Sequence, residues 1–214
     1  MNKLLTLCLA LGLSLPAWAL DEAGSQRLLE VQQRWAQIQY EIPQDDKAKA
    51  FEQLAAKSEA FTREQPQAAE AWIWHGIVTS SWAGAEGGLG ALGKAKDARR
   101  FLETSIKLDP KALQGSAYTS LGTLYDRVPG WPVGFGDEDE AEKLLKQAVQ
   151  INPQGIDSLY FWGDHLYRQD KYAEAREALL KAKQAAPRPG RELADQGRQH
   201  EIDELLKTVE AKLN

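Results

Sequence analysis

The sequence has 214 residues, of which 43% are hydrophobic and 27% are charged, and its net charge is −5 at pH 7. A chain of this length can bury a core without metal or disulfide staples, so we expect a single domain. The acidic balance argues against nucleic acid or an anionic membrane as the principal partner.

Residues 1–19 have the pattern of a secretory signal. Lys3 gives a positive start, an apolar run follows, and the small-x-small triplet at 17–19 fits a cleavage site. The run is too short to span a membrane, so we expect a periplasmic protein with no stable membrane insertion. Cys8, the only cysteine, lies too early in this segment for lipidation. The mature chain would therefore be no lipoprotein and would have neither disulfides nor thiol chemistry.

A helical pattern recurs from Asp21 onward with the same residue types at the same positions. The clearest unit consists of Leu159, Trp162, Gly163 and Leu166, followed by Ala175, Leu179, Ala182 and Pro187. Two earlier units repeat it as Tyr118, Leu121, Gly122, Tyr125, Ala141, Leu145, Ala148 and Pro153, and as Trp72, His75, Gly76, Ala98, Leu102, Ser105 and Pro110. These spacings strongly resemble the tetratricopeptide family, whose repeat is a 34-residue helix-turn-helix.

The resemblance implies an all-α superhelix of the tetratricopeptide type over residues 20–214, with small residues where paired helices cross closely. We expect a degenerate first pair, then three repeats, then a capping helix with one apolar face. Their approximate limits are 22–66 for the first pair, 67–110, 111–153 and 154–187 for the repeats, and 191–213 for the cap.

Two consecutive repeats carry insertions between their first and second helices. The spacing from the signature glycine to the signature alanine is 12 residues in the last repeat, but 22 and 19 in the two repeats before it. Equivalent turns of a stacked solenoid emerge on the same edge, and insertions there often mark the binding face. The two inserted loops are therefore predicted to be neighbours.

The first insertion, at about residues 80–96, is predicted to be a glycine-rich loop that offers Trp82, Gly88 and Gly90 to a ligand. Residues 88–94 also satisfy G-x-G-x-x-G and G-x-x-x-x-G-K. We interpret both matches as accidental, because a helix rather than a strand precedes them and no serine or threonine follows the lysine.

The second insertion, at residues 128–137, reads Val-Pro-Gly-Trp-Pro-Val-Gly-Phe-Gly-Asp. Its prolines and glycines exclude a helix, so Trp131 and Phe135 need burial or a partner in a loop. We expect the two loops to wall a pocket; the alternative is that they only pack on one another and cover a helix edge. Asp137 and Glu140 have capping-box spacing, which predicts that the next helix begins there.

A second group of candidate ligand contacts falls on positions that line the concave groove in tetratricopeptide proteins: Arg127, Tyr160, Asp164 and Arg168. Guanidinium groups pair well with carboxylates, which favours a carboxylate ligand, but salt bridges between neighbouring helices explain the same residues. The lysine and asparagine pattern of chaperone-tail-binding domains is absent at Tyr160 and Asp164, so that partner is not expected.

We find no arrangement of residues for nucleophilic or acid–base catalysis, so the protein is predicted not to be an enzyme. The three histidines lack metal-ligand spacing, and neither a metal nor another cofactor is expected. His75 replaces a leucine of the repeat and is interpreted as a hydrogen-bonded core histidine. Trp72 and Trp162 are expected in the core.

The segments around Trp82, at 128–137 and at 187–191 resemble a group of periplasmic tetratricopeptide proteins similar to the T component associated with tripartite (TRAP) transporters. This resemblance implies a non-enzymatic accessory of solute transport that binds a small apolar or carboxylate-bearing ligand, or docks on a substrate-binding protein. The T component is a lipoprotein and an oligomer; this chain lacks the lipidation cysteine, and its oligomeric state stays open. The alternative is a protein-interaction scaffold for envelope assembly that uses the concave groove.

Overall fold

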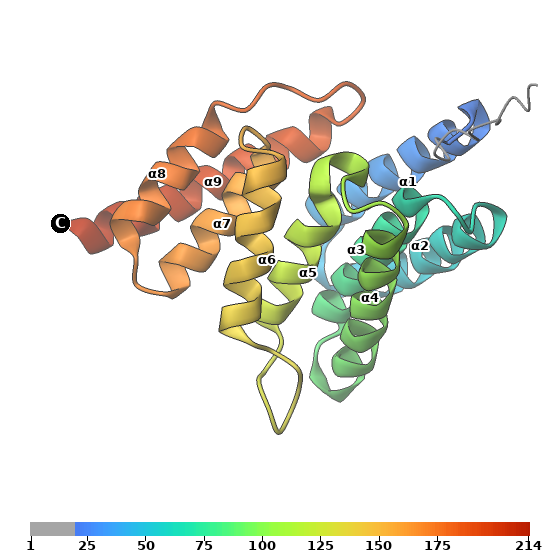
Figure 1. Ribbon diagram of the computed structural model, residues 1–214, viewed down its shortest axis with the longest axis horizontal. Helices are drawn as coiled ribbons and strands as arrows, with labels where there is room; N and C mark the ends of the chain where they lie inside the picture. Colours follow the sequence, from blue (N-terminus) through green and yellow to red (C-terminus); the bar gives the residue numbers. More distant parts are fainter. Residues whose placement is uncertain (1–19) are drawn as a thin grey trace, which may run out of the picture.

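The computed structural model describes residues 20–214, which form nine α-helices and one short 3₁₀ helix (Figure 1). The predicted signal segment and Cys8 lie outside the described residues. The helices are α1 (Glu22–Tyr40), α2 (Gln44–Glu64), α3 (Ala69–Glu86), α4 (Gly88–Leu108), η1 (Ala112–Gly115), α5 (Ser116–Arg127), α6 (Glu138–Ile151), α7 (Ile156–Arg168), α8 (Tyr172–Lys183) and α9 (Glu192–Leu213).

The helices pack as four successive pairs, α1/α2 to α7/α8, followed by α9 against α8 (Figure 1). This arrangement confirms the predicted all-α superhelix. The signature glycines explain the pairing, because a Cβ placed on any of them would lie only 2.7–2.8 Å from a leucine of the partner helix. The contacts are Gly76 with Leu102, Gly122 with Leu145, and Gly163 with Leu179.

The prediction of a loop over residues 80–96 is wrong. Helix α3 continues to Glu86 and α4 begins at Gly88, so Gly87 alone separates them. Gly87 and Gly88 have φ values of +65° and +63°, a left-handed conformation that glycine adopts without strain. The insertion thus lengthens both helices of its repeat, and its other glycines lie within helices.

Residues 128–137 form the predicted loop, which projects between α5 and α6 (Figure 1). Backbone hydrogen bonds close its base, from Gly136 N to Pro129 O and from Asp137 N to Tyr125 O, each 3.0 Å long. Helix α6 begins at Glu138, and the carboxylate of Asp137 accepts a hydrogen bond of 3.0 Å from Glu140 N, as the capping spacing predicts.

The superhelix closes on itself through a contact between its first and last helices, α1 and α9. Gln33 Nε2 of α1 donates a hydrogen bond of 3.4 Å to Gly190 O, just before α9. Gly197 lies so close to the ring of Tyr40 that a Cβ there would come within 2.4 Å of it. One turn of superhelix is therefore nearly a ring, and its concave side becomes a bounded space.

The core has two parts, one formed mainly by α1 to α5 and the other by α7 to α9. Trp72 and Trp162 are half-buried rather than fully in the core. Trp72 Nε1 donates to Pro66 O over 2.9 Å, and Trp162 stacks on His165 with ring centroids 5.6 Å apart. Within residues 20–214, none of the helices has the length and apolarity that crossing a membrane requires.

Candidate functional site: a cavity inside the closed superhelix

A cavity of about 960 Å³ lies on the concave side, between the first helices of the pairs and the N-terminal end of α9. Pockets for small molecules usually have volumes of about 300–1,000 Å³, so this cavity is large enough for a whole ligand. Its wall combines aromatic rings, hydroxyl and amide groups, and four arginines. Such a wall suits a compact ligand with both an apolar and a charged part.

One side of the cavity is an aromatic wall built from α1 and α3. The rings of Trp35 and Trp74 meet edge to face, with centroids 5.9 Å apart. Trp35 Nε1 donates a hydrogen bond of 2.8 Å to Ser81 Oγ, which fixes the indole. Ser81 and Gly84 belong to the inserted part of α3, and both line the cavity. The first insertion thus extends the cavity wall.

The opposite side is formed by α7, the segment before α9, and α9 itself. Asp157 is its central anion, 2.6 Å from Arg188 Nη1 and 2.9 Å from Arg198 Nε. Burial alone would raise the pKa of Asp157, but the two arginines hold that pKa below its usual range. Arg198 also lies 4.4 Å and 4.6 Å from the ring centres of Tyr160 and Phe161.

Backbone strain occurs at the floor of the cavity, in η1. Leu113 and Gln114 have φ values of 46° and 56°, in the left-handed region that residues with a Cβ rarely adopt. Gln114 accepts a hydrogen bond of 2.9 Å from Asn152 Nδ2, and all three residues line the cavity. Strain of this kind is often found at functional sites, where the surrounding packing holds it in place.

Arg191 differs from the other cavity arginines, because the described residues offer its guanidinium no ion pair. Its Cζ atom lies 5.0 Å from the ring centre of Trp74, and its buried Nε has no hydrogen-bond partner there either. Burial, and next the neighbouring charge of Arg188, lower the pKa of Arg191 to about 10. The side chain therefore remains a cation at neutral pH.

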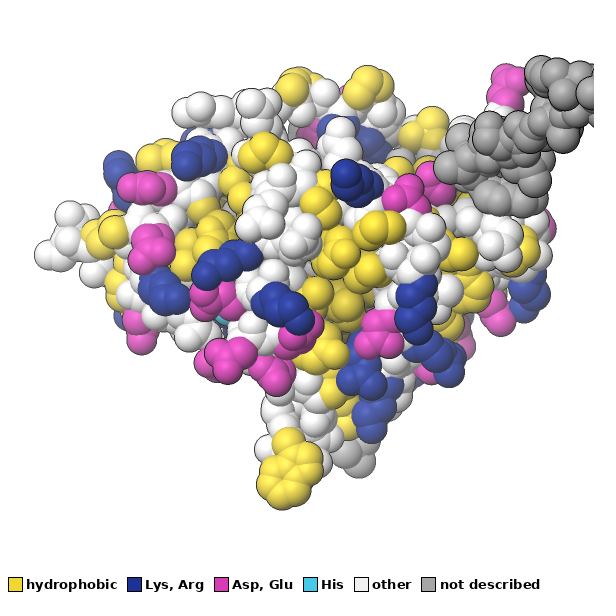
Figure 2. All heavy atoms as spheres, viewed as in Figure 1, with side chains coloured by type: hydrophobic (Ala, Val, Ile, Leu, Met, Phe, Trp, Pro, Cys, Tyr) yellow, Lys and Arg dark blue, Asp and Glu magenta, His cyan; other side chains and the backbone are white. Residues whose placement is uncertain are grey.

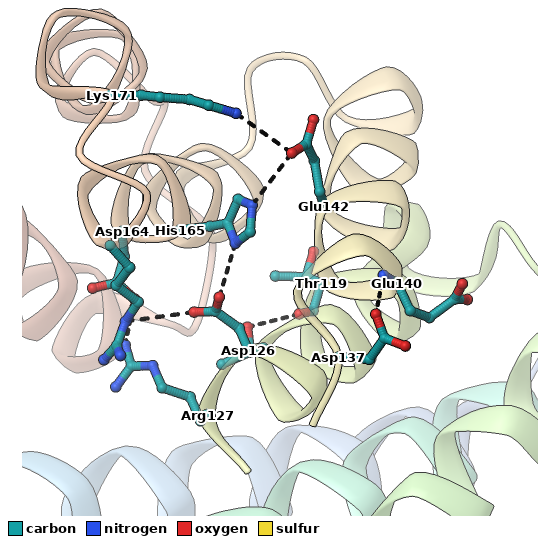
Figure 3. Close-up of polar contacts among 11 residues, drawn as sticks. Thr119, Asp126, Arg127, Asp137, Glu140, Glu142, Asp164, His165 and Lys171 are labelled. Carbon is teal, nitrogen blue, oxygen red and sulfur yellow. Dashed lines mark hydrogen bonds and ion pairs between the residues drawn. The ribbon is translucent and has the colours of Figure 1, made fainter. Parts of the chain in front are cut away.

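Three of the predicted groove residues form an ion-pair network at the joint between α5, α6 and α7 (Figure 3). Asp164 Oδ2 lies 2.5 Å from Arg127 Nη2 and 3.2 Å from Arg168 Nε. Arg168 also lies 3.4 Å from Asp126. The alternative of salt bridges between neighbouring helices therefore describes these residues, although Arg127 also lines the cavity.

The same joint buries His165 completely, between Asp126 and Glu142 (Figure 3). His165 Nδ1 lies 2.8 Å from Asp126 Oδ1, whereas Nε2 has no hydrogen-bond partner among the described residues and lies 3.9 Å from Glu142. An Asp-His pair of this kind resembles part of a catalytic triad. Within residues 20–214, however, no hydroxyl group hydrogen bonds to the imidazole.

The predicted pocket between two loops does not exist in that form, because the first insertion is helical. The second insertion nevertheless touches helix α4, just after the first insertion: Arg99 of α4 stacks over the ring of Phe135, with 4.5 Å from Cζ to the ring centre. Phe135 also packs edge to face on Tyr125, with centroids 5.4 Å apart. Trp131 is 90% exposed at the tip, and Figure 2 shows an apolar tip at this place.

The other predicted contact residues, Trp82, Gly88 and Gly90, take part in the packing and turns of α3 and α4. Lys94 lies over the ring of Trp82, 4.3 Å from its centre, and pairs with Glu86. Gly88 and Gly90 form the first turn of α4. Of the nine predicted contact residues, Arg127 and Tyr160 line the cavity described here.

The C-terminal arginines and the aromatic wall were not predicted from the sequence. The prolines and glycine at 187–190 mark a break before the capping helix, but their sequence gives no sign that this break faces α1. His75 is buried and lies 2.8 Å from Ser58 Oγ, as a core histidine should, and burial lowers its pKa to about 4. No cluster of three potential metal ligands occurs within residues 20–214.

The fold is a tetratricopeptide-type superhelix whose first and last helices meet beside a cavity. In agreement, residues 133–195 match the family model described as tetratricopeptide repeat. No curated protein sequence matches the chain.

A solved structure shows the same fold at low sequence identity. This thermophilic tetratricopeptide protein of Thermus thermophilus, TTC0263, is 15% identical with a TM-score of 0.55; the match covers 85% of this chain and 99% of that one. Two structures of MamA are 18% and 16% identical, with TM-scores of 0.45 and 0.44. These matches cover 80% and 88% of this chain, and 95% and 91% of theirs.

Proposed function

We propose that the protein is a non-enzymatic, exported binding protein that holds a small apolar or carboxylate-bearing ligand in its concave cavity. The observation that carries this proposal is the cavity of about 960 Å³ on the concave side, with its aromatic and arginine-rich walls. The tetratricopeptide fold suits protein interaction, so a periplasmic protein partner could receive the bound ligand. We propose that the protein acts as an accessory of periplasmic solute transport.

The contact between α1 and α9 favours a compact ligand over a long helix or extended peptide. The concave side is bounded where α1 meets the α9 region, at Gly190 against Leu29 and at Gly197 against Tyr40. A scaffold role through the groove itself is thus less favoured.

Native mass spectrometry of the protein purified from a periplasmic extract tests the proposal. We expect one small molecule per chain in the wild-type protein. The cavity-filling variant Ser120→Trp should lose it, because Ser120 lines the cavity on α5. The control Gln147→Trp should retain it, because Gln147 lies on a separate surface of α6. A wild-type protein without any bound molecule, or equal retention in both variants, would contradict the proposal.

A second role, docking on another periplasmic protein such as a substrate-binding protein, is favoured by the exposed loop tip. Trp131 and Val133 are 90% and 65% exposed, although the base of their loop is fixed by hydrogen bonds. An exposed tryptophan on a fixed support is a typical anchor for a protein partner. A stoichiometric partner that Trp131→Ala fails to retain, and that Ser120→Trp retains, would support this role; a partner bound equally by both variants would contradict it.

A further inference from the structure

The charge of the cavity wall differs from that of the whole protein. The chain has a net charge of −5, yet Arg127, Arg188, Arg191 and Arg198 line the cavity with only two carboxylates, Asp157 and Glu201. Arg188 and Arg198 share Asp157, and Arg198 also pairs with Glu201. The carboxylates of the wall are thus already engaged by two of its arginines.

Arg127 is likewise engaged, because it pairs with Asp164 behind the wall. Arg191 is left without an ion pair among the described residues. Leaving a half-buried guanidinium without a carboxylate is unfavourable unless another anion approaches it. The guanidinium of Arg191 is therefore available to pair with an anion that comes from outside the chain.

Arg191 is also held in place. Its guanidinium packs over Trp74, which is only 4% exposed and which itself packs on Trp35. The residue stands directly before the first turn of α9, after Gly190 with a φ of +73°. A guanidinium fixed on an aromatic ring loses little conformational entropy when it binds an anion, and its planar donors match a carboxylate.

The surfaces beside Arg191 are apolar. Trp35, Trp74 and Ile77 line the cavity on the side of α1 and α3, and Leu124 and Phe161 line it from α5 and α7. A ligand whose charged group reaches Arg191 would therefore rest its remaining atoms on aromatic and aliphatic side chains. Burial of that apolar part would supply much of the affinity.

We propose that the cavity selects an organic anion, a carboxylate attached to an apolar or aromatic body, and that Arg191 is the residue that reads the charge. This inference rests on the proposed function, since it names the chemical class of the ligand for the same cavity. It assigns a specificity role to a residue outside the repeats, at the start of the capping helix.

Two fluorescent probes that differ only in their charged group test the inference. 1-Pyrenebutyrate carries a carboxylate, and 1-pyrenebutanol carries a neutral hydroxyl on the same apolar body. Titrations at neutral pH, followed by pyrene and tryptophan fluorescence, give a dissociation constant for each. We expect the wild-type protein to bind the carboxylate about tenfold more tightly, as a charge-assisted contact should.

Arg191→Gln should remove this preference and leave the affinity for 1-pyrenebutanol unchanged. Arg191→Lys should keep part of the preference, because it retains the charge but not the planar fork. The control Arg100→Gln removes an exposed arginine of α4 outside the cavity lining and should behave like the wild-type protein. Circular dichroism verifies that each variant is folded.

The outcomes separate the inference from the proposed function. Equal affinity of the wild-type protein for both probes would overturn the anion selectivity while leaving the cavity as a binding site. A preference that persists unchanged in folded Arg191→Gln would overturn the role of Arg191. Binding of neither probe would contradict the proposed function together with the inference.

Discussion

The two insertions occupy the same place in consecutive repeats, yet one continues two helices and the other forms a projecting loop. In the first, α3 and α4 are separated by Gly87 alone, and its residues extend the wall of the cavity. In the second, residues 128–137 leave the helices and contribute nothing to the cavity lining. Insertions at equivalent turns can therefore serve different surfaces of one superhelix.

Proline explains much of this difference. The second insertion contains Pro129 and Pro132, each of which would cost about 3 kcal/mol inside a helix. The first insertion contains glycines but no proline, and each glycine costs only about 1 kcal/mol relative to alanine. Burial of Ala83 and Ala95, and the partial burial of Trp82, offset that cost.

The largest effect is expected for Gly136→Ala at the base of the projecting loop. A Cβ at this position would lie 1.8 Å from Val128 O, a backbone atom that cannot rotate away. We expect a loss of about 2 to 4 kcal/mol in the free energy of unfolding, because the loop must open to admit the methyl group. Urea denaturation measures it, and a wild-type midpoint would show that the loop base is not closed in solution.

Phe135→Ala should cost about 2 kcal/mol. The ring is half-buried between Tyr125 and Arg99, and its removal takes away apolar contact and leaves a gap. The matched change at the tip, Trp131→Ala, should alter the free energy of unfolding by less than about 0.5 kcal/mol, since that side chain is 90% exposed. Equal losses in the two variants would contradict the assignment of Phe135 to the loop base and Trp131 to a free tip.

Glycine-to-alanine changes should have the opposite sign in the first insertion. Gly93 lies inside α4, and a Cβ there would have no heavy atom within 4 Å. Gly93→Ala should raise the free energy of unfolding by about 0.5 to 1 kcal/mol, because alanine lowers the entropy cost of the helix. Thermal unfolding followed at 222 nm measures the change. A decrease would indicate that residues 88–96 are a loop after all.

A further small effect concerns the contact between helix α4 and the projecting loop. A double-mutant cycle with Arg99→Ala and Phe135→Ala should give a coupling energy of about 0.5 to 1 kcal/mol for the guanidinium on the ring. Glu103, which lies 3.6 Å from Arg99, remains in every variant of the cycle. Strict additivity would mean that α4 and the projecting loop do not interact through this pair in solution.

The sequence predicts the repeat because its determinants are local. Gly122 and Ala141, for example, must be small wherever two helices cross, and this requirement gives a readable period. The start of α6 was predictable for the same reason, since Asp137 and Glu140 form a cap within one turn. The first insertion was mispredicted because its glycines suggest a loop, while the packing that keeps it helical involves other helices.

The cavity could not be predicted, because it depends on closure of the superhelix. Gln33 and Gly190, which meet at that closure, are 157 residues apart in the sequence. The repeat pattern contains no residue that predicts their contact. Arg191 becomes notable only when closure brings it over Trp74. Arg127 and Tyr160 were identified from their register on the concave side, which is a property of the repeat.

Hydrogen–deuterium exchange with and without saturating 1-pyrenebutyrate tests most directly whether ligands bind inside the superhelix rather than at the projecting loop. We expect slower exchange in α5 and around residues 186–198, whose side chains line the cavity, and unchanged exchange in residues 128–137. Protection confined to residues 128–137 would contradict the account and place the binding site at the exposed tip.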